Sequence, residues 1–154
     1  MTAVLSVGSN LGDRLGHLRL AVQVLDPWAV SSVWETAPVG GVPQDDYLNA
    51  VLLCALDATA AWERAQEAER RAGREREVRW GPRTLDVDVV TADGPVPAGL
   101  ELPHPRAAER AFVLAPWVEV DADAVLPGAG RVRDLLAGLG PAGVRRRDDL
   151  VLRP

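Results

Sequence analysis

Two aspartates at positions 86 and 88 are the residues whose types and spacing best suit chemistry. They lie in segment 84–90, where polar and apolar residues alternate. This alternation is typical of a half-buried strand, so both carboxylates share one face, about 7 Å apart along the strand. Aspartate is disfavoured in strands, which suggests a function for the pair. Carboxylate oxygens suit a hard cation such as Mg²⁺, which completes its shell with water and substrate phosphates.

Arginines directly before this segment suit an anionic ligand. Arg74, Arg76, Arg79 and Arg83 lie within ten residues, and Gly81-Pro82 marks a turn, so we expect them on a loop. A planar guanidinium matches the geometry of phosphate oxygens. The alternative is that the arginines only form surface ion pairs with the aspartates, and the residue types alone leave that open.

The bulk composition limits the possible partners. The chain has 154 residues and a net charge of −5, which argues against binding to nucleic acid or to an anionic membrane surface, so any anion site must be local. It contains no lysine, and its single cysteine, Cys54, excludes a disulfide within the chain. We find no signal peptide and no apolar run of about 18 residues. We therefore expect a cytoplasmic monomer with one domain over residues 1–154.

The order of predicted elements indicates the fold class. Helical patterns follow Asp13, a predicted N-cap, and run from Thr59 to Gly73, a predicted C′ residue. Four segments have the composition of strands: residues 3–7, 29–35, 47–56 and 84–90. The resulting order, β-α-β-β-α-β, predicts an α+β ferredoxin-like sandwich with a mainly antiparallel sheet and helices packed on it.

The C-terminal part gives weaker signals. Apolar spacing predicts a short helix over 131–139, and the tail from Gly140 is predicted to be a loop. The charged run 145–149 is interpreted as solvated surface.

One further pair of residues suits a flat ligand. Tyr47 and Asn49 share a face of the predicted strand 47–56 and follow a long loop, 36–46, of a length that is often functional. An aromatic ring beside an amide could hold a heterocycle by stacking and hydrogen bonding. Without further context, the residues favour the plainer interpretation of a half-buried tyrosine and an asparagine near a turn.

Three stretches together make the sequence recognisable. They are segments 34–40 with 47–50, segments 73–76 with 79–88, and segments 103–106 with 109–114, and the turn 8–13 precedes them. In this order they resemble the 6-hydroxymethyl-7,8-dihydropterin pyrophosphokinases of folate biosynthesis. The resemblance covers about residues 3–120 and fades beyond Trp117.

The resemblance implies transfer of the β,γ-pyrophosphoryl group of ATP, the co-substrate, to the hydroxymethyl oxygen of the pterin, which leaves AMP. It also implies that two Mg²⁺ ions are held by Asp86 and Asp88. The implied catalytic residues are Arg74, Arg76, Arg83, Asp86 and Asp88. The implied nucleotide-binding residues are Gln66, Trp80, Arg83, Val89, His104 and Arg110. The implied pterin-binding residues are Thr36, Val39, Tyr47, Asn49 and Phe112.

The sequence departs from the family pattern in three places, one of which is the proline-rich segment 95–102, with Gly99 and Glu101 where some members have an arginine and a threonine that contact ATP. The first long loop contains Pro43-Gln44-Asp45 in place of a frequent Asp-Gln-Pro, and Pro105 stands where some members have a tyrosine near the nucleotide. No residue stands out as a dedicated general base, so metal activation of the attacking hydroxyl is expected to suffice.

Two other functions remain as alternatives. A palm-type enzyme that transfers nucleotides with two metals would share the aspartate pair but would not require Tyr47, Asn49 and Phe112, and it would release pyrophosphate rather than AMP. An RNA-binding sheet would need surface aromatics and basic charge. The chain has 5% aromatic residues and is acidic, which argues against the second alternative.

Overall fold

The structure is a computed structural model that describes residues 1–38, 43–73, 84–140 and 143–153. The strands are β1 Ala3–Ser9, β2 Ala29–Val30, β3 Trp34–Thr36, β4 Tyr47–Cys54, β5 Asp86–Ala92, β6 Val125–Leu126, β7 Gly130–Arg131 and β8 Val144–Arg146. The helices are α1 Arg14–Leu25, α2 Ala58–Arg71, α3 Ala111–Val120 and α4 Val132–Leu139, with a 3₁₀ turn at Ala107–Glu109. None of the helices in these described ranges is long and apolar enough to cross a membrane.

The main sheet has the order β5-β1-β4-β3-β8, with β2 also paired to β4. Each of these strand pairs is antiparallel. Strand β1 lies inside the sheet, between β4 and β5, and each of the two helices α1 and α2 connects strands of this sheet. This is the predicted ferredoxin-like α+β arrangement, so the fold class is confirmed.

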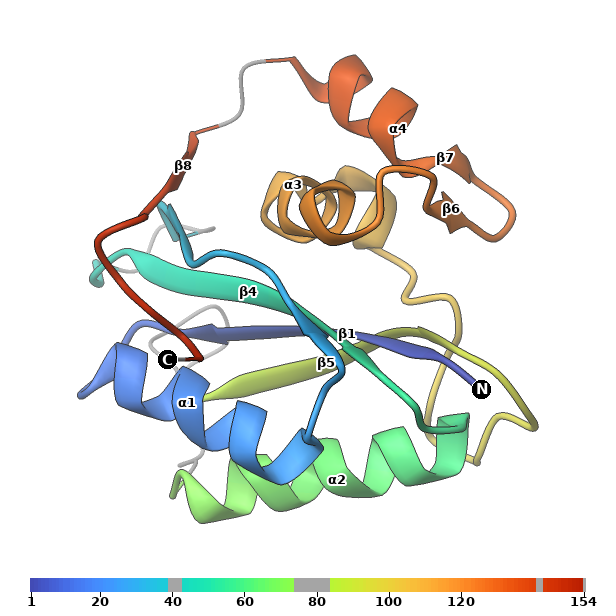
Figure 1. The fold of residues 1–154 in the computed structure, drawn as a ribbon, viewed down its shortest axis with the longest axis horizontal. Coiled ribbons are helices and arrows are strands. Elements are labelled where there is room, and N and C mark those ends of the chain that lie inside the picture. Colours follow the sequence, from blue (N-terminus) through green and yellow to red (C-terminus); the bar gives the residue numbers. More distant parts are fainter. Residues whose placement is uncertain (39–42, 74–83, 141–142, 154) are drawn as a thin grey trace.

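Helices cover both faces of the sheet (Figure 1). Helices α1 and α2 pack on one face, where Leu5, Val7 and Leu52 are buried. Helices α3 and α4 lie on the other face, where a second cluster includes Val4 and Val51. Neighbours along β1 therefore point to opposite cores, as the period of a strand requires.

The ends of α1 and α2 follow from local residue chemistry. The side chain of Asp13 accepts a hydrogen bond from the backbone N–H of Gly16 at 3.0 Å, which confirms the predicted N-cap of α1. Asp57 caps α2 in the same way through Ala60. Gly73 follows Ala72, the C-cap of α2, with φ of 70°, a conformation that favours glycine, as predicted for a C′ residue.

The predicted strand 29–35 is in fact two short strands, β2 and β3. The break lies at Ser31, whose hydroxyl oxygen accepts a hydrogen bond from the backbone N–H of Val51 at 2.9 Å. A serine hydroxyl can replace a backbone carbonyl in this way, so the chain leaves the regular ladder between Val30 and Trp34.

The prediction that the tail from Gly140 is a loop is wrong for residues 144–146, whereas the charged run 145–149 is largely solvated as predicted, since Arg145, Arg146, Asp148 and Asp149 are exposed. Residues 144–146 form β8, which pairs with β3, and the chain end then runs back beside α1 (Figure 1). Arg145 and Arg147 form ion pairs with the buried carboxylate of Glu35, and Leu152 is buried in the core beneath α1. The run is nonetheless tied to the fold, because Glu35 pairs with two of its arginines from more than 100 residues away.

Helix α3 was not predicted from the sequence. Its buried residues are consecutive, from Val113 to Trp117, so they lack the spacing of an amphipathic helix. Pro116 also lies inside it, and proline is normally unfavourable in a helix interior. Burial against β4 and α4 outweighs these local preferences.

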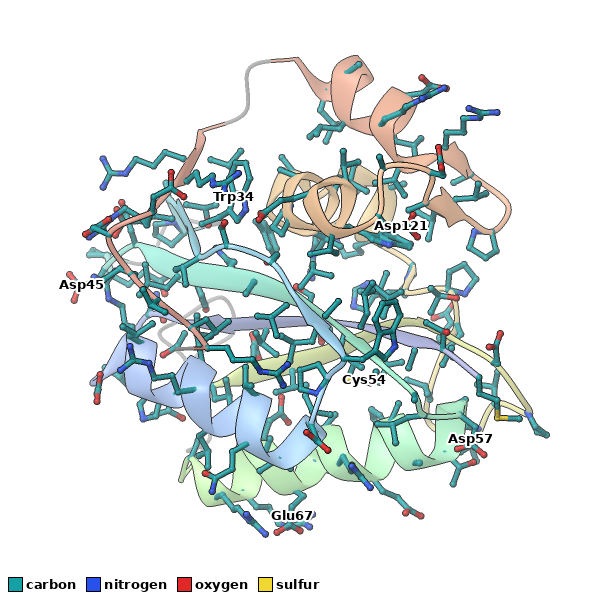
Figure 2. The ribbon with its side chains drawn as sticks, in the orientation of Figure 1. Trp34, Asp45, Cys54, Asp57, Glu67 and Asp121 are labelled. Atoms are coloured by element: carbon teal, nitrogen blue, oxygen red, sulfur yellow. The ribbon has the colours of Figure 1, made fainter. Side chains whose placement is uncertain are left out.

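We predict that Asp57→Ala lowers the free energy of unfolding by about 1 kcal/mol, because it removes the cap of α2. Asp57 lies at the first turn of this helix (Figure 2), and its Oδ1 is 2.8 Å from the backbone nitrogen of Ala60. Asp57→Asn, which keeps an acceptor, is the matched control and should cost far less. Urea unfolding measures both variants, and equal stability of the two would contradict a capping role.

Candidate active site

A cavity of about 570 Å³ lies on the face of the sheet that carries α3. Its floor is formed by side chains of β1, β3, β4 and β5, and its other walls by residues 104–112 and by Gly143 and Val144. Strand alternation decides which side chains reach it, because residues at i and i+2 share a face.

The predicted aspartate pair lies on this face. In β5, Asp86 and Asp88 are half-buried and line the cavity, whereas the alternate residues Val87 and Val89 are buried in the core with α1 and α2. Strand pairing places Gly8 opposite Asp86. Both carboxylates therefore open into one cavity, as the alternation predicted.

Arg110 brings a positive charge to the aspartates. Its Nη1 lies 3.6 Å from Oδ2 of Asp88, and its guanidinium carbon lies 5.5 Å from the centre of the Phe112 ring. Such a position over an aromatic face favours a cation. Arg110 thus links the aspartate end of the cavity to the start of α3.

His104 adds a hydrogen-bond donor to the same wall. Its backbone N–H donates to the carbonyl of Val90 at 2.8 Å, which ties the segment to the outer edge of β5. Burial lowers the pKa of the imidazole, although Asp88 acts in the opposite direction. The ring Nδ1 accepts a hydrogen bond from the backbone N–H of Arg106 at 3.2 Å. A neutral ring with this bond carries its proton on Nε2, which can donate to a ligand.

The other end of the cavity has neutral polar side chains in place of charged ones. Asn49 Nδ2 donates to the Thr36 hydroxyl oxygen at 2.9 Å, and both side chains are buried. Gly8 makes room for this arrangement, because a Cβ at that position would lie 3.0 Å from Asn49 Oδ1 and 3.4 Å from Tyr47 Cδ1. A larger residue at position 8 would therefore displace the amide.

Two aromatic side chains reach the cavity from opposite layers. Tyr47 comes from the sheet, at the start of β4, and Phe112 comes from the first turn of α3, which lies above the sheet (Figure 1). Both line the cavity, and both are half-buried. Rings contributed by two opposing layers can hold a flat ligand between them.

Some predicted site residues do not line this cavity. Gln66 is exposed on α2, across the sheet, and the side chain of Val89 is 2% exposed in the core. The N–H of Val87 points to the outer edge of β5, where Glu69 Oε2 accepts it at 2.9 Å. Alternate backbone groups point the same way, so Val89 can offer its backbone to a ligand at that edge. Val39, Arg74, Arg76, Trp80 and Arg83 lie outside the described residues and stay predictions.

Other cavity residues were not predicted. Ser6 and Gly8 line it, and their alternation with buried Leu5 and Val7 was a signal that could have found them. Glu109, which forms an ion pair with Arg106, also lines it, as does Val144. Sequence gave no signal for Val144, because its place depends on the distant pairing of β8 with β3.

The donor set suits a divalent cation that shares its ligands with a substrate. Within the described ranges no group of three or more His, Cys, Asp or Glu side chains is arranged to hold a metal. Two aspartates beside a cavity instead match Mg²⁺, which commonly takes one or two carboxylates and completes its shell with water and phosphate oxygens. The residues therefore fit a metal that binds together with a phosphorylated ligand.

Comparisons with known proteins agree with this geometry. Residues 4–122 match the family model described as 7,8-dihydro-6-hydroxymethylpterin-pyrophosphokinase. Three similar relatives are all named 2-amino-4-hydroxy-6-hydroxymethyldihydropteridine pyrophosphokinase. The Mycobacterium leprae protein is 50% identical over an alignment of 165 residues, and this alignment covers 92% of this chain and 86% of the relative. The Bacillus subtilis protein is 42% identical (77% of each chain) and the Methylorubrum extorquens protein 39% identical (94% of this chain and 97% of its own). The chain therefore belongs to the 7,8-dihydro-6-hydroxymethylpterin-pyrophosphokinase family, as its motifs predicted.

Proposed function

We propose that the chain transfers the pyrophosphoryl group of ATP to the hydroxymethyl oxygen of 6-hydroxymethyl-7,8-dihydropterin in this cavity, giving AMP and the pterin diphosphate. One observation carries the assignment to this site. A single cavity combines the pair Asp86 and Asp88 with an aromatic and amide group formed by Tyr47, Asn49 and Phe112. The first set suits a metal and a polyphosphate, and the second suits a flat heterocycle.

The spacing of the two ends fits a transfer between two bound substrates. Asp86, Gly8 and Asn49 lie in one row across β5, β1 and β4. Neighbouring strands are about 4.8 Å apart, so the carboxylate and the amide lie about 10 Å from each other, measured between strands. Gly8 leaves the floor between them open. A pterin held at Asn49 could extend its hydroxymethyl group toward a polyphosphate held at the aspartates.

At the phosphate end, Asp86 and Asp88 would hold the Mg²⁺ ions. Bound Mg²⁺ neutralises phosphate charge and lowers the pKa of a coordinated hydroxyl. Arg110 and the Nε2–H of His104 would donate hydrogen bonds to phosphate oxygens, since charge-assisted bonds to phosphate are strong. Pyrophosphoryl transfer needs positioning and charge stabilisation rather than a covalent intermediate. We therefore assign no residue the role of a nucleophile.

The remaining nucleotide contacts extend the same proposal. Gln66 and the backbone of Val89 would contact the nucleotide from α2 and the edge of β5. Residues outside the described ranges complete the set: Arg74, Arg76 and Arg83 for the polyphosphate, Trp80 for the nucleotide and Val39 for the pterin. Their roles rest on the family resemblance of segment 73–88 and of segment 34–40.

At the pterin end, the ring would stack between Tyr47 and Phe112. Its polar edge would meet the amide of Asn49 and the hydroxyl of Thr36, which already bond to each other at 2.9 Å. Because these polar groups are buried, a ligand that leaves them unpaired would bind poorly. This end therefore selects for a heterocycle with matching donors and acceptors.

The test is an assay of AMP release with ATP, Mg²⁺ and the hydroxymethyl-dihydropterin. We expect AMP and the pterin diphosphate in equal amounts. Release of inorganic pyrophosphate with a nucleotide attached to the acceptor would instead indicate nucleotidyl transfer and overturn the proposal.

Asp86→Asn and Asp88→Asn should each lower turnover by about 100-fold or more, since each removes charge stabilisation worth several kcal/mol. The fold should survive, because asparagine is nearly isosteric with aspartate. Asp123→Asn, an exposed residue after α3, is the matched control and should keep full turnover. Near-normal AMP release by both cavity variants at low millimolar Mg²⁺ would remove the metal assignment.

Phe112→Ala should weaken pterin binding about tenfold, because stacking contributes about 0.5–1.5 kcal/mol beyond simple burial. Binding of an unreactive ATP analogue should stay nearly unchanged. Phe112→Tyr, which keeps the ring, should retain most of the pterin affinity. Calorimetry measures both ligands on each variant, and equal weakening of the two ligands by Phe112→Ala would contradict separate ends of the cavity.

A further inference from the structure

The C-terminal strand β8 lies outside residues 4–122, the part that matches the family model, and yet it contributes to the cavity. It pairs antiparallel with β3, and Val144 is directly opposite Thr36. Residues directly opposite each other share a face of the sheet. Val144 therefore lies beside Thr36 on the cavity face, at the end assigned to the pterin.

The opposite face of the same two strands explains what holds β8 in place. Glu35, between Trp34 and Thr36, is 6% exposed and lies on the α1 side of the sheet. Its Oε1 accepts hydrogen bonds from Arg145 and, at 3.1 Å, from Arg147. Its Oε2 accepts one at 3.1 Å from Arg14 of α1. One buried carboxylate thus joins two arginines of the C-terminal segment to a helix and to β3.

Other contacts of the C-terminal segment act beside Glu35: Arg19 of α1 donates two hydrogen bonds to the carbonyl of Val151, Arg146 lies 3.9 Å from Glu119, and Leu152 is buried in the core. Strand β8 has three residues and lies at the edge of the sheet, where a short pairing is weak by itself. Beyond the strand, the backbone N–H of Arg147 donates to the carbonyl of Val33 at 2.8 Å. Burying a carboxylate is costly unless it is paired, so Glu35 strongly favours the arrangement in which β8 is attached.

Val144 complements its polar neighbours. Thr36 and Asn49 present a hydroxyl and an amide to the ligand, whereas the valine presents only methyl groups and is half-buried. An apolar side chain in this position excludes water from one side of a bound ring and limits the space along its edge.

We propose that Val144 contacts the heterocyclic substrate and limits its size, and that Glu35 is a positioning residue that keeps Val144 in place through Arg145 and Arg147. The inference rests on the proposed function, in which the end of the cavity at Thr36 and Asn49 binds the pterin. It adds to that function a wall of the site supplied by the C-terminal segment.

The contact is tested by Val144→Phe and Val144→Ala in the full chain. Because the larger ring would overpack this wall, Val144→Phe should raise the pterin Kd about tenfold. Val144→Ala removes two methyl groups from this wall, so it should raise the pterin Kd about fivefold. Binding of an ATP analogue should be unchanged in both. Val151→Phe, an exposed residue of the same tail, is the matched control and should bind as the wild type does.

The positioning role is tested by Glu35→Gln. We expect the pterin KM to rise about fivefold, in line with the loss of the Val144 contact, while kcat and the ATP KM stay within about twofold. Arg145→Gln changes an exposed side chain, so it should fold normally and give a smaller shift of the same kind. In a Val144→Ala background, Glu35→Gln should add little, because both changes remove the same contact.

The outcomes separate this inference from the function on which it rests. Unchanged pterin affinity of both Val144 variants would overturn the contact. Fully additive effects of Glu35→Gln and Val144→Ala, or an equal rise of the ATP KM, would show that Glu35 only supports the fold. Failure of the wild-type chain to bind or convert the pterin would overturn the proposed function itself.

Discussion

The antiparallel register of β1 with its two neighbours fixes where the side chains of β1, β4 and β5 lie on the cavity floor. Gly8 is opposite both Asp86 of β5 and Asn49 of β4, and Ser6 is opposite Asp88. A slip of one residue would turn each of these side chains to the other face. The buried residues Leu5 and Val7 prevent such a slip, because it would expose them. Apolar packing under α1 and α2 therefore holds the polar face in register, although it contacts no ligand.

The parts of the site that follow from strand alternation could be predicted from the sequence. Asp86 and Asp88, and likewise Tyr47 and Asn49, share a face because they are two residues apart in strands with clear patterns. Phe112 and Arg110 were found through the family motif, since helix α3 has no amphipathic pattern. The wall at Val144 could not be found, because it depends on a pairing between residues 108 positions apart. Predictions for segment 74–83 concern residues outside the described ranges.

Charge is distributed so that an acidic chain can still hold an anion. With a net charge of −5, the protein repels polyphosphates at long range. Near Asp88, Arg110 lies at 3.6 Å, which is longer than a hydrogen bond. Arg110 thus adds positive charge at the aspartate end of the cavity without a direct hydrogen bond to Asp88. Arg14, Arg145 and Arg147, in contrast, are directed at Glu35 and serve the fold.

The short segment 32–36 contacts three other parts of the cavity: α3, β8 and the floor at Asn49. Glu119 of α3 accepts hydrogen bonds from the backbone and hydroxyl of Ser32 and from the indole of Trp34, which lies beside α3 (Figure 2). Glu35 holds β8 on the opposite face, and Thr36 bonds to Asn49 on the floor. Strand alternation lets neighbouring residues serve different faces. The position of α3 above the end of the cavity at Thr36 and Asn49, and the position of β8 at its side, therefore both depend on segment 32–36.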